Sequence, residues 1–524
     1  MKRLLVFLFL LIGFVFSEEI EKHPIKCGLS DHFFKSSGTR PIFPDSVASE
    51  HFKFHFTTTG EDSISVTDAD ENGIPDWIDS SAIYAEYSYH LLLDSLLLPE
   101  PPEDNQGFPE IDIYFEDTGA YGWTEKDQEK GAFENEFGRR TRWTSFIRID
   151  NDFPPEDFFT SYYEALKVTI AHELFHVFQF GIGTWEFTDG EREFLEGNAV
   201  WMEDFAFPEV NDYLDYLPGY FDDPTRDIST YDYEFGIFYT FLVGYFGDLS
   251  FMANLWAQIE EMPNYVALEH TISEQWNSNF SNILTHFGTW NCFTGTRALE
   301  GLFYEDAALF PEIIFSDESE TKKKIQINSD GVSDSLVVKK NAVSYLRIKT
   351  TGTEEISGGF ESGNQLIQCQ TSFHEWESDL LVTQSLLSGN PFFIEKVRST
   401  DNLFWVFSNT SDTEKQITIS LNGEPFYTDN RFLKVYPNPA FVENTKQISF
   451  LVEFQKQQQF LRLRIFDLLG REIYTSDWYR NVPEGTNLFY WTLDSATQPL
   501  GSGVYFYWID GQFADFKGVF TIVK

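Results

Sequence analysis

Two histidines and a glutamate are the residues of this sequence best suited to chemistry. They occur as His172-Glu173-x-x-His176 in a run of mostly apolar residues. Positions i and i+4 share one face of a helix, so both imidazoles can reach one metal ion, with Glu173 beside them to accept a proton. The apolar neighbours predict a buried helix, and buried polar groups are costly unless something binds them. We therefore expect a Zn²⁺ site with Glu173 as the catalytic base; the alternative is a pair of hydrogen-bonded core histidines.

A second predicted helix, residues 193–205, offers a third metal ligand. The Glu-Gly-x-Ala-x-Trp-x-Glu stretch that begins at Glu196 resembles the third-ligand helix of the gluzincin metallopeptidases, the clan of thermolysin and the one-zinc aminopeptidases. The resemblance implies that Glu196 completes the zinc site. Glu203 lies on the same helix face and is the other candidate, as the true ligand or as a partner of a ligand. The metzincin pattern is excluded because Gln179 and Ile182 occupy the positions of its glycine and third histidine.

Tyr233 is a candidate for stabilising negative charge during catalysis. The sequence Tyr233-Glu-x-Gly236 resembles the Tyr-x-x-Gly element of the one-zinc aminopeptidases, in which the tyrosine stabilises the tetrahedral intermediate. The lysine usual in that element is replaced by Phe235. A core or surface aromatic residue is the alternative for Tyr233, and His270 and His286 are other candidate donors.

Residues 68–79 predict a calcium loop. Asp68-Ala-Asp70-Glu-Asn72-Gly73 follows the D-x-[DN]-x-[DN]-G pattern, in which the glycine permits a sharp turn. The expected ligands are the side chains of Asp68, Asp70, Asn72, Asp76 and Asp79 and the carbonyl of Ile74. Because the twelfth position is Asp and the preceding segment is a predicted strand, the loop resembles those of dockerins or thrombospondin type 3 repeats more than a paired EF-hand. The alternative is an Asx-rich turn that caps the following helix.

The composition excludes some classes of function. The chain has 524 residues, of which 42% are apolar, enough for the cores of about three domains. A formal net charge of −46 argues against nucleic-acid binding, which needs a basic face. Residues 1–17 have the basic start and apolar run of a signal peptide, and no later stretch reaches the length of a membrane span. We expect a protein that is secreted or attached to the bacterial cell surface.

Residues 18–49 are expected to form an N-terminal segment or a short propeptide. Cys27 in this segment lies in a stretch that faintly resembles the cysteine-switch peptide of some zymogens; a structural thiol is the alternative. With Cys292 and Cys369 it allows one disulfide and one thiol after export, and the pairing stays open.

Around the metal motif, the hydrophobic pattern predicts an α+β domain over residues 50–315. Strands are expected at 50–57, 111–115 and 143–149 and a helix at 75–98, followed by a helical lobe. The motif His-Phe-x-x-His, the Asn-Gly-x-Pro-Asp loop, an Asp-Ile-Tyr strand and His-Glu-x-x-His-x-x-Gln together resemble a family of secreted bacterial metallopeptidases. This resemblance implies a zincin-like fold and a protein or peptide substrate.

Two all-β sandwich modules are expected after the catalytic domain. Short alternating runs punctuated by Gly, Ser, Asn and Asp predict the first at residues 321–422. Residues 434–524 contain Val435-Tyr-Pro-Asn-Pro439, later strands and a terminal Lys-Gly-Val-Phe-Thr-Ile-Val-Lys, an order that resembles the C-terminal sorting domain of the type IX secretion system. The resemblance implies that this machinery is a partner. An immunoglobulin module like that of a flagellar hook cap is the second interpretation.

Together these patterns predict a secreted zinc-dependent endopeptidase that uses Zn²⁺ for hydrolysis and Ca²⁺ for stability. The alternative is a non-catalytic surface binding or adhesion protein built on a zincin scaffold. The intact Glu173 favours the enzyme, because a decayed site need not keep its base.

Overall fold

A computed structural model gives the fold of most of the chain. The residues it describes are 25–27, 39–104, 110–186, 190–327, 331–350, 354–362, 367–375, 380–386, 388, 392–397, 402–425, 430–454, 457–496, 499–511 and 514–524. The expected signal peptide lies outside them, as do residues 18–24 and 28–38 of the N-terminal segment. Two compact units result, one up to Ile314 with the short segments Lys339–Val343 and Ser408–Thr413, the other made of the rest from Phe315 onward.

The first unit contains a mixed sheet in the order β1-β5-β6-β4-β3-β2, with β7 paired to β6. Its strands are β1 (Ile25–Cys27), β2 (Asp45–Ala48), β3 (Phe52–Phe56), β4 (Ile111–Glu116), β5 (Ala120–Asn135), β6 (Gly138–Asp150) and β7 (Thr184–Trp185). Three of the neighbours, β3, β4 and β6, run parallel, whereas β5 is antiparallel to β6. The sequence predicted β3, β4 and β6 but not β5. In β1, Ile25 pairs in parallel with Ala120 of β5, and Cys27 pairs with Gly122.

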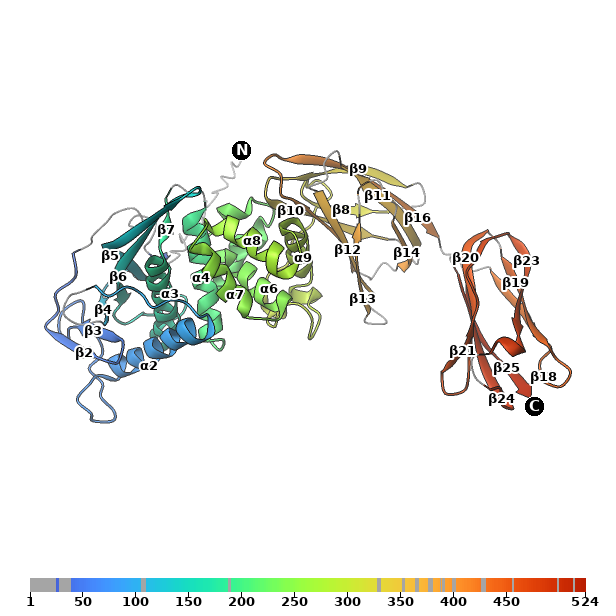
Figure 1. Ribbon diagram of the computed structural model, residues 1–524, viewed down its shortest axis with the longest axis horizontal. Helices are drawn as coiled ribbons and strands as arrows, with labels where there is room; N and C mark the ends of the chain where they lie inside the picture. The colour runs from blue at the N-terminus through green and yellow to red at the C-terminus, as the bar shows by residue number, and fades with distance from the viewer. Residues whose placement is uncertain are drawn as a thin grey trace, which may run out of the picture. The chain divides into compact units, whose positions relative to one another are not determined.

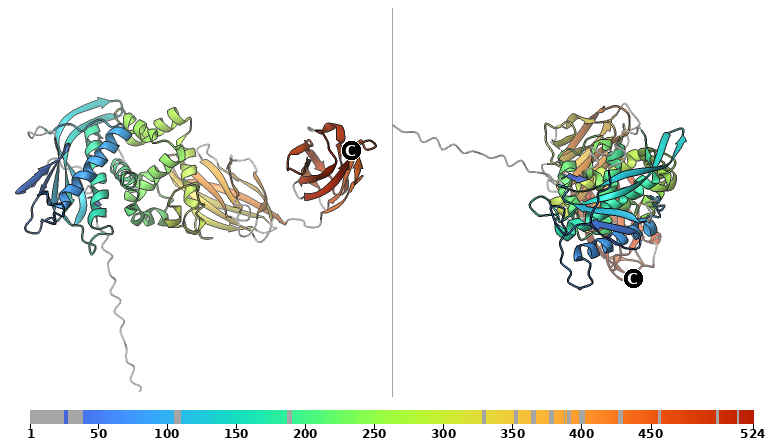
Figure 2. Two further views of the ribbon diagram at one scale, coloured as in Figure 1. Left: turned by 90° about the horizontal axis from the view of Figure 1, so that it is seen from below. Right: turned by 90° about the vertical axis from the view of Figure 1, so that its left-hand side faces the viewer.

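Helices α2 and α3 lie along one face of this sheet, and the remaining helices form a lobe beyond them (Figures 1 and 2). The α-helices are α2 (Asp76–His90), α3 (Tyr162–Ile182), α4 (Glu191–Ala206), α5 (Leu217–Asp222), α6 (Gly236–Phe246), α7 (Ser250–Ile259), α8 (Asn264–Trp276) and α9 (Phe280–Cys292). A π-helical turn, η1 (Leu91–Ser95), continues α2, and the 3-10 turns are η2 (Asp212–Asp215), η3 (Ile228–Thr230), η4 (Tyr233–Phe235), η5 (Gly295–Arg297) and η6 (Ala307–Leu309). From Ala165 to Ile182, every residue of α3 except Lys167 is buried, as its apolar sequence requires.

The second unit is built from strands. One module has a five-stranded sheet, β13-β12-β15-β10-β8, and a four-stranded sheet, β14-β11-β16-β9. Its strands are β8 (Lys322–Gln326), β9 (Val332–Val338), β10 (Ala342–Lys349), β11 (Glu354–Glu361), β12 (Ile367–Glu375), β13 (Leu380–Leu386), β14 (Phe392–Val397), β15 (Asn402–Asn409) and β16 (Lys415–Pro425). Buried residues from both sheets, among them Leu346, Trp405 and Ile417, form one core.

The last module has a three-stranded sheet, β17-β19-β23, and a six-stranded sheet in which β18-β25-β24-β20-β21 are joined by β22. Its elements are β17 (Arg431–Tyr436), β18 (Ala440–Phe441), β19 (Gln447–Phe454), β20 (Gln458–Phe466), β21 (Glu472–Thr475), β22 (Tyr479–Val482), β23 (Gly485–Thr492), η7 (Leu493–Ser495), β24 (Gly503–Gly511) and β25 (Ala514–Val523). Phe450, Trp491 and Ile522 belong to its core.

The chain therefore has a mixed α/β N-terminal region with a helical lobe, followed by β-sheet modules, as the sequence predicted at this level. Within the described residues, no helix combines the length and the hydropathy needed to span a membrane. Cys292 and Cys369 are buried thiols that do not bridge each other.

Candidate metal centre

Helices α3 and α4 bring His172, His176 and Glu196 together, as the sequence predicted. The Nε2 atoms of the two histidines are 3.1 Å apart, and Glu196 Oε2 lies 3.2 Å from the first and 3.4 Å from the second. Tetrahedral Zn²⁺ with bonds of about 2.0–2.1 Å places its ligand atoms about 3.3 Å apart. The three side chains thus have the spacing of one face of a zinc coordination tetrahedron and could bind a metal ion.

Each histidine is oriented through its other ring nitrogen. His172 Nδ1 lies 2.6 Å from Glu203 Oε1, and His176 Nδ1 lies 2.7 Å from Gln179 Oε1. Both oxygens are acceptors, so both Nδ1 atoms donate a proton to them, and a bound metal ion would meet the lone pairs of both Nε2 atoms. Gln179 is held in turn, because its Nε2 donates to the carbonyl of Leu195 at 3.2 Å. Such supporting contacts fix the tautomer and ring angle of metal-binding histidines.

The charges of the cluster call for a cation. All four ionisable groups, His172, His176, Glu196 and Glu203, are at most 1% exposed. Burial lowers the pKa of His172, but its contacts with Glu196 and Glu203 outweigh burial and raise the pKa to about 10. Burial raises the pKa of Glu196, yet contacts with His172 and His176 outweigh it and lower the pKa to about 2. The surroundings thus favour added positive charge between the ligand atoms, which a divalent metal ion would supply.

Glu173 lies on the same helix, fully buried beside this cluster. Thr124 of β5 lies within hydrogen-bond distance, its Oγ1 2.8 Å from Glu173 Oε2 and 2.8 Å from the Glu173 carbonyl. Among the described residues, Glu173 Oε1 has no hydrogen-bond partner. Burial raises the pKa of the Glu173 carboxyl above its ordinary value. At Gly122 a Cβ would lie 2.8 Å from the Arg148 carbonyl and 3.3 Å from Glu173 Cγ, so a side chain there would crowd both β6 and α3.

Tyr233 lies next to the metal cluster in η4, with its ring centroid 6.3 Å from that of His172. Gly236 makes this position possible: a Cβ there would lie 2.7 Å from Val200 Cγ1, so the start of α6 comes unusually close to α4. Arg192, one turn before Glu196 on α4, binds Asp232 at 2.9 Å. Burial and the charge of Glu196 raise the pKa of Asp232 to about 7, although Arg192 opposes the shift. Tyr233 and the Arg192–Asp232 ion pair therefore lie beside the predicted site.

The residues of the expected calcium loop are only partly brought together. Carboxylate oxygens of Asp68, Asp70 and Asp76 lie within 4.8 Å of one another. Asn72 instead donates through Nδ2 to Asp79 at 2.8 Å, and its Oδ1 accepts from the amide of Ile74 at 2.7 Å. Backbone amides also reach the acidic side chains, as in an Asx-rich turn. Calcium binding by all six predicted residues requires the Asn72 side chain to turn.

Comparisons with known proteins add little to this geometry. No family model matches the sequence, and no curated protein matches it. Among solved structures, the adhesin domain of Epf from Streptococcus pyogenes has 9% identity and a TM-score of 0.16, over 36% of this chain and 77% of that one. An FMN-binding β-glucuronidase from Facaelibacterium prausnitzii has 13% identity and a TM-score of 0.14, over 37% of this chain and 34% of that one. Scores this low carry no inference about fold or activity.

Proposed function

We propose that the protein is a secreted zinc-dependent endopeptidase of gluzincin type, with a zincin-like catalytic domain over residues 50–315. The observation that carries this proposal is the convergence of two imidazole Nε2 atoms and one carboxylate oxygen beside a buried glutamate. His172, His176 and Glu196 would hold the ion. Three protein ligands leave a fourth position for water or substrate, which is the arrangement of catalytic rather than structural zinc.

The chemistry follows from the groups around the ion. Bound Zn²⁺ supplies Lewis acidity, which lowers the pKa of water and polarises a peptide carbonyl. Glu173 takes the proton of the attacking water and later delivers it to the leaving amine. The Thr124 hydroxyl holds one oxygen of Glu173 and leaves Oε1 available for this transfer. Tyr233 donates a hydrogen bond to the oxygen that becomes negative as the carbonyl is attacked.

A non-catalytic surface binding protein is the second candidate, and one observation favours it. The three ligand residues and Glu173 are at most 1% exposed, as in a metal site that only stabilises a fold. A peptide reaches the ion only if a neighbouring side chain moves, and half-buried Tyr233 is the neighbour we assign to that movement.

Metal analysis combined with peptide cleavage tests the enzyme proposal. The parent protein should contain about one zinc per chain and lose cleavage of a mixed peptide substrate on chelation, with recovery on zinc addition. Glu173→Gln should keep the zinc and lose about 10²-fold or more of the turnover, because it removes the base and no ligand. A zinc-loaded parent without cleavage, or an equally active Glu173→Gln, would make the second candidate the better one.

For the last module, we propose recognition by the type IX secretion machinery, with delivery to the cell surface or the medium. Support comes from the ordered motifs of residues 434–524, and the module has its own core. Deleting these residues should leave the chain in the periplasm with zinc and cleavage intact. Surface delivery of the shortened chain would refute this assignment.

A further inference from the structure

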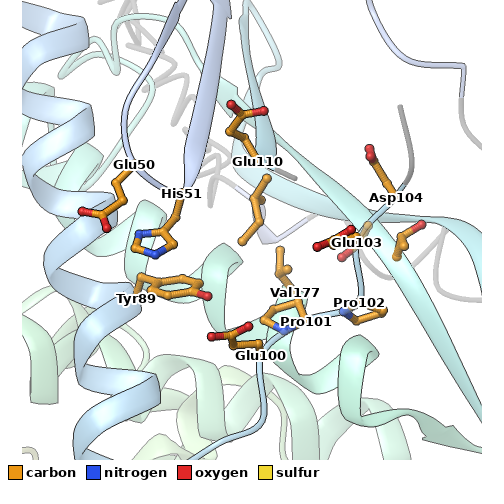
Figure 3. Close-up of a pocket in the computed structure, with 13 residues that line it drawn as sticks. Glu50, His51, Tyr89, Glu100, Pro101, Pro102, Glu103, Asp104, Glu110 and Val177 are labelled. Carbon is orange, nitrogen blue, oxygen red and sulfur yellow. The ribbon is translucent and has the colours of Figure 1, made fainter. Parts of the chain in front are cut away.

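A pocket of about 230 Å³ lies in the first unit, bordered by the end of α2, the starts of β3 and β4, β6 and the segment before residue 105 (Figure 3). Val177 of α3 contributes to its wall, one residue beyond His176. His176 itself faces the metal cluster and does not line the pocket. The volume is many times the roughly 10–15 Å³ that one water molecule needs in a cavity.

Four glutamates in the wall of this pocket have no cationic partner among the described residues. Glu50, Glu100, Glu103 and Glu110 line it, and within the described part of the chain none of them takes part in an ion pair. Asp104 differs, because Arg40 lies 2.6 Å from it. Figure 3 shows Glu50 on one side and Glu103 on the other, with the apolar Val177 and Pro101 between them.

Buried polar groups also lack partners in this pocket. Ser145 is 8% exposed, and its Oγ has no hydrogen-bond partner among the described residues. One carboxylate oxygen of Glu110, Oε2, is also buried and has no hydrogen-bond partner among the described residues. Both residues line the pocket, so a ligand bound there can pair with these two atoms. Burial and the charges of Glu100 and Glu86 raise the pKa of the pocket residue Tyr89 to about 12, which keeps its hydroxyl protonated at neutral pH.

The geometry favours an organic cation over a metal ion. Within the described residues, the acidic and histidine groups close enough to hold a metal do not include Glu50, Glu100, Glu103 or Glu110. The neighbouring cluster of His51, Glu86 and His90 has such spacing, but the Glu86 carboxylate is already occupied by Ser49 Oγ, the His51 amide and His51 Nδ1, at 2.6, 2.9 and 2.6 Å. A compact ion would also leave most of the cavity unfilled and the apolar wall without a partner.

We propose that this pocket binds a small linear diamine. One ammonium group lies near Glu103, the other near Glu50 and Glu100, and the methylenes between them cover Val177 and the prolines. Ammonium–carboxylate contacts are charge-assisted hydrogen bonds, which are stronger than neutral ones, and an alkyl chain suits the apolar strip. This proposal does not depend on the peptidase assignment.

Calorimetric titration of the full-length protein with 1,5-diaminopentane at constant ionic strength tests it. We expect saturable binding of one diamine per chain, and weaker binding of n-pentylamine, which has one ammonium group. Glu103→Gln with Glu110→Gln should weaken diamine binding about tenfold or more. The matched control, Glu274→Gln with Glu300→Gln, changes the net charge equally at exposed positions elsewhere and should bind as the parent does.

Three results would overturn the proposal. The first is a titration whose binding heats do not saturate, and the second is an equal loss of diamine affinity in the control variant. The third is displacement of the diamine by stoichiometric Ca²⁺, which would make the pocket an inorganic cation site. Circular dichroism shows whether the double variant is folded. Glu103 is exposed, so Glu103→Gln alone provides a second variant whose folding is not at risk, and unchanged diamine affinity in it would equally count against the proposal.

Discussion

The sharpest prediction concerns the two glutamates of α4, which the sequence could not tell apart. Glu196 Oε2 lies beside both Nε2 atoms, whereas Glu203 Oε1 contacts the opposite nitrogen of His172 at 2.6 Å. Glu196→Ala should therefore abolish stoichiometric zinc binding, because it removes a ligand. Glu203→Ala should keep the site but weaken it, because it removes only the acceptor that orients His172.

The size of the second effect follows from burial. His172 is 1% exposed, so Glu203→Ala leaves its Nδ1–H without an acceptor in a dry environment. An unsatisfied buried donor costs about 1–3 kcal/mol, and loss of such a supporting partner typically weakens metal binding by about 10–100-fold. Glu203→Gln keeps an acceptor oxygen at this position and should fall between the parent and Glu203→Ala.

Competition with a chromogenic zinc chelator measures all of these affinities. Glu164→Gln is the control, since it removes an exposed carboxylate from α3 without touching the cluster. Melting of the metal-free proteins separates lost affinity from lost folding. If Glu203→Ala empties the site while Glu196→Ala retains zinc, the ligand assignment is wrong, and if neither differs from Glu164→Gln, the cluster is not the zinc site.

Three further predictions concern the surroundings of the site. Thr124→Val removes a hydrogen bond that stabilises ionised Glu173, so the acidic limb of the pH–rate profile should move to higher pH; an unmoved limb would contradict this role. Burial raises the pKa of Glu191 to about 7 from an ordinary value near 4.3. As the pH rises between these two values, Glu191 loses its proton in the unfolded state but keeps it in the folded state, so the free energy of unfolding falls. The gain in melting temperature from Glu191→Gln should therefore be larger at pH 7 than at pH 5, and equal gains would exclude the shift. Asp70→Ala should reduce the rise in melting temperature that calcium causes in the parent, and a parent whose melting is independent of calcium would rule out the loop site.

The sequence located the candidate metal cluster because its signals are local. Helical periodicity places His172 and His176 on one face, and the apolar run around them predicts burial. The sequence also offered Glu203 as a partner of a ligand, and it contacts His172. The partner role of Gln179 was missed, although Gln179 lies at helical spacing from His176. Whether Glu196 or Glu203 is the third ligand depends on the angle at which α4 crosses α3. That angle depends on packing, which includes the close approach of Gly236 to α4, and the sequence does not display it.

Other features depend on pairing that the sequence does not display. Strand β5 was missed because charged residues interrupt its alternation, from Glu125 to Glu134, and its length comes from pairing with β6. The contact of Thr124 with Glu173 was missed with it. The pocket of Figure 3 joins residues from separate strands and a proline-rich segment, and nothing in the local pattern around Ser145 or Glu110 indicates that they share a cavity.

The pairing of β1 with β5 has a consequence for what else can pair with β5. Ile25 and Cys27 lie in register with Ala120 and Gly122, so this short strand uses backbone hydrogen-bonding groups of β5 close to Glu173. Proteolytic trimming beyond Cys27 would turn that stretch of β5 into an open edge, and open edges accept any extended polypeptide. In the untrimmed chain the N-terminal segment and an incoming polypeptide would compete for the same backbone groups. The length of the N terminus would therefore set how readily another polypeptide can lie as a strand beside the candidate metal cluster.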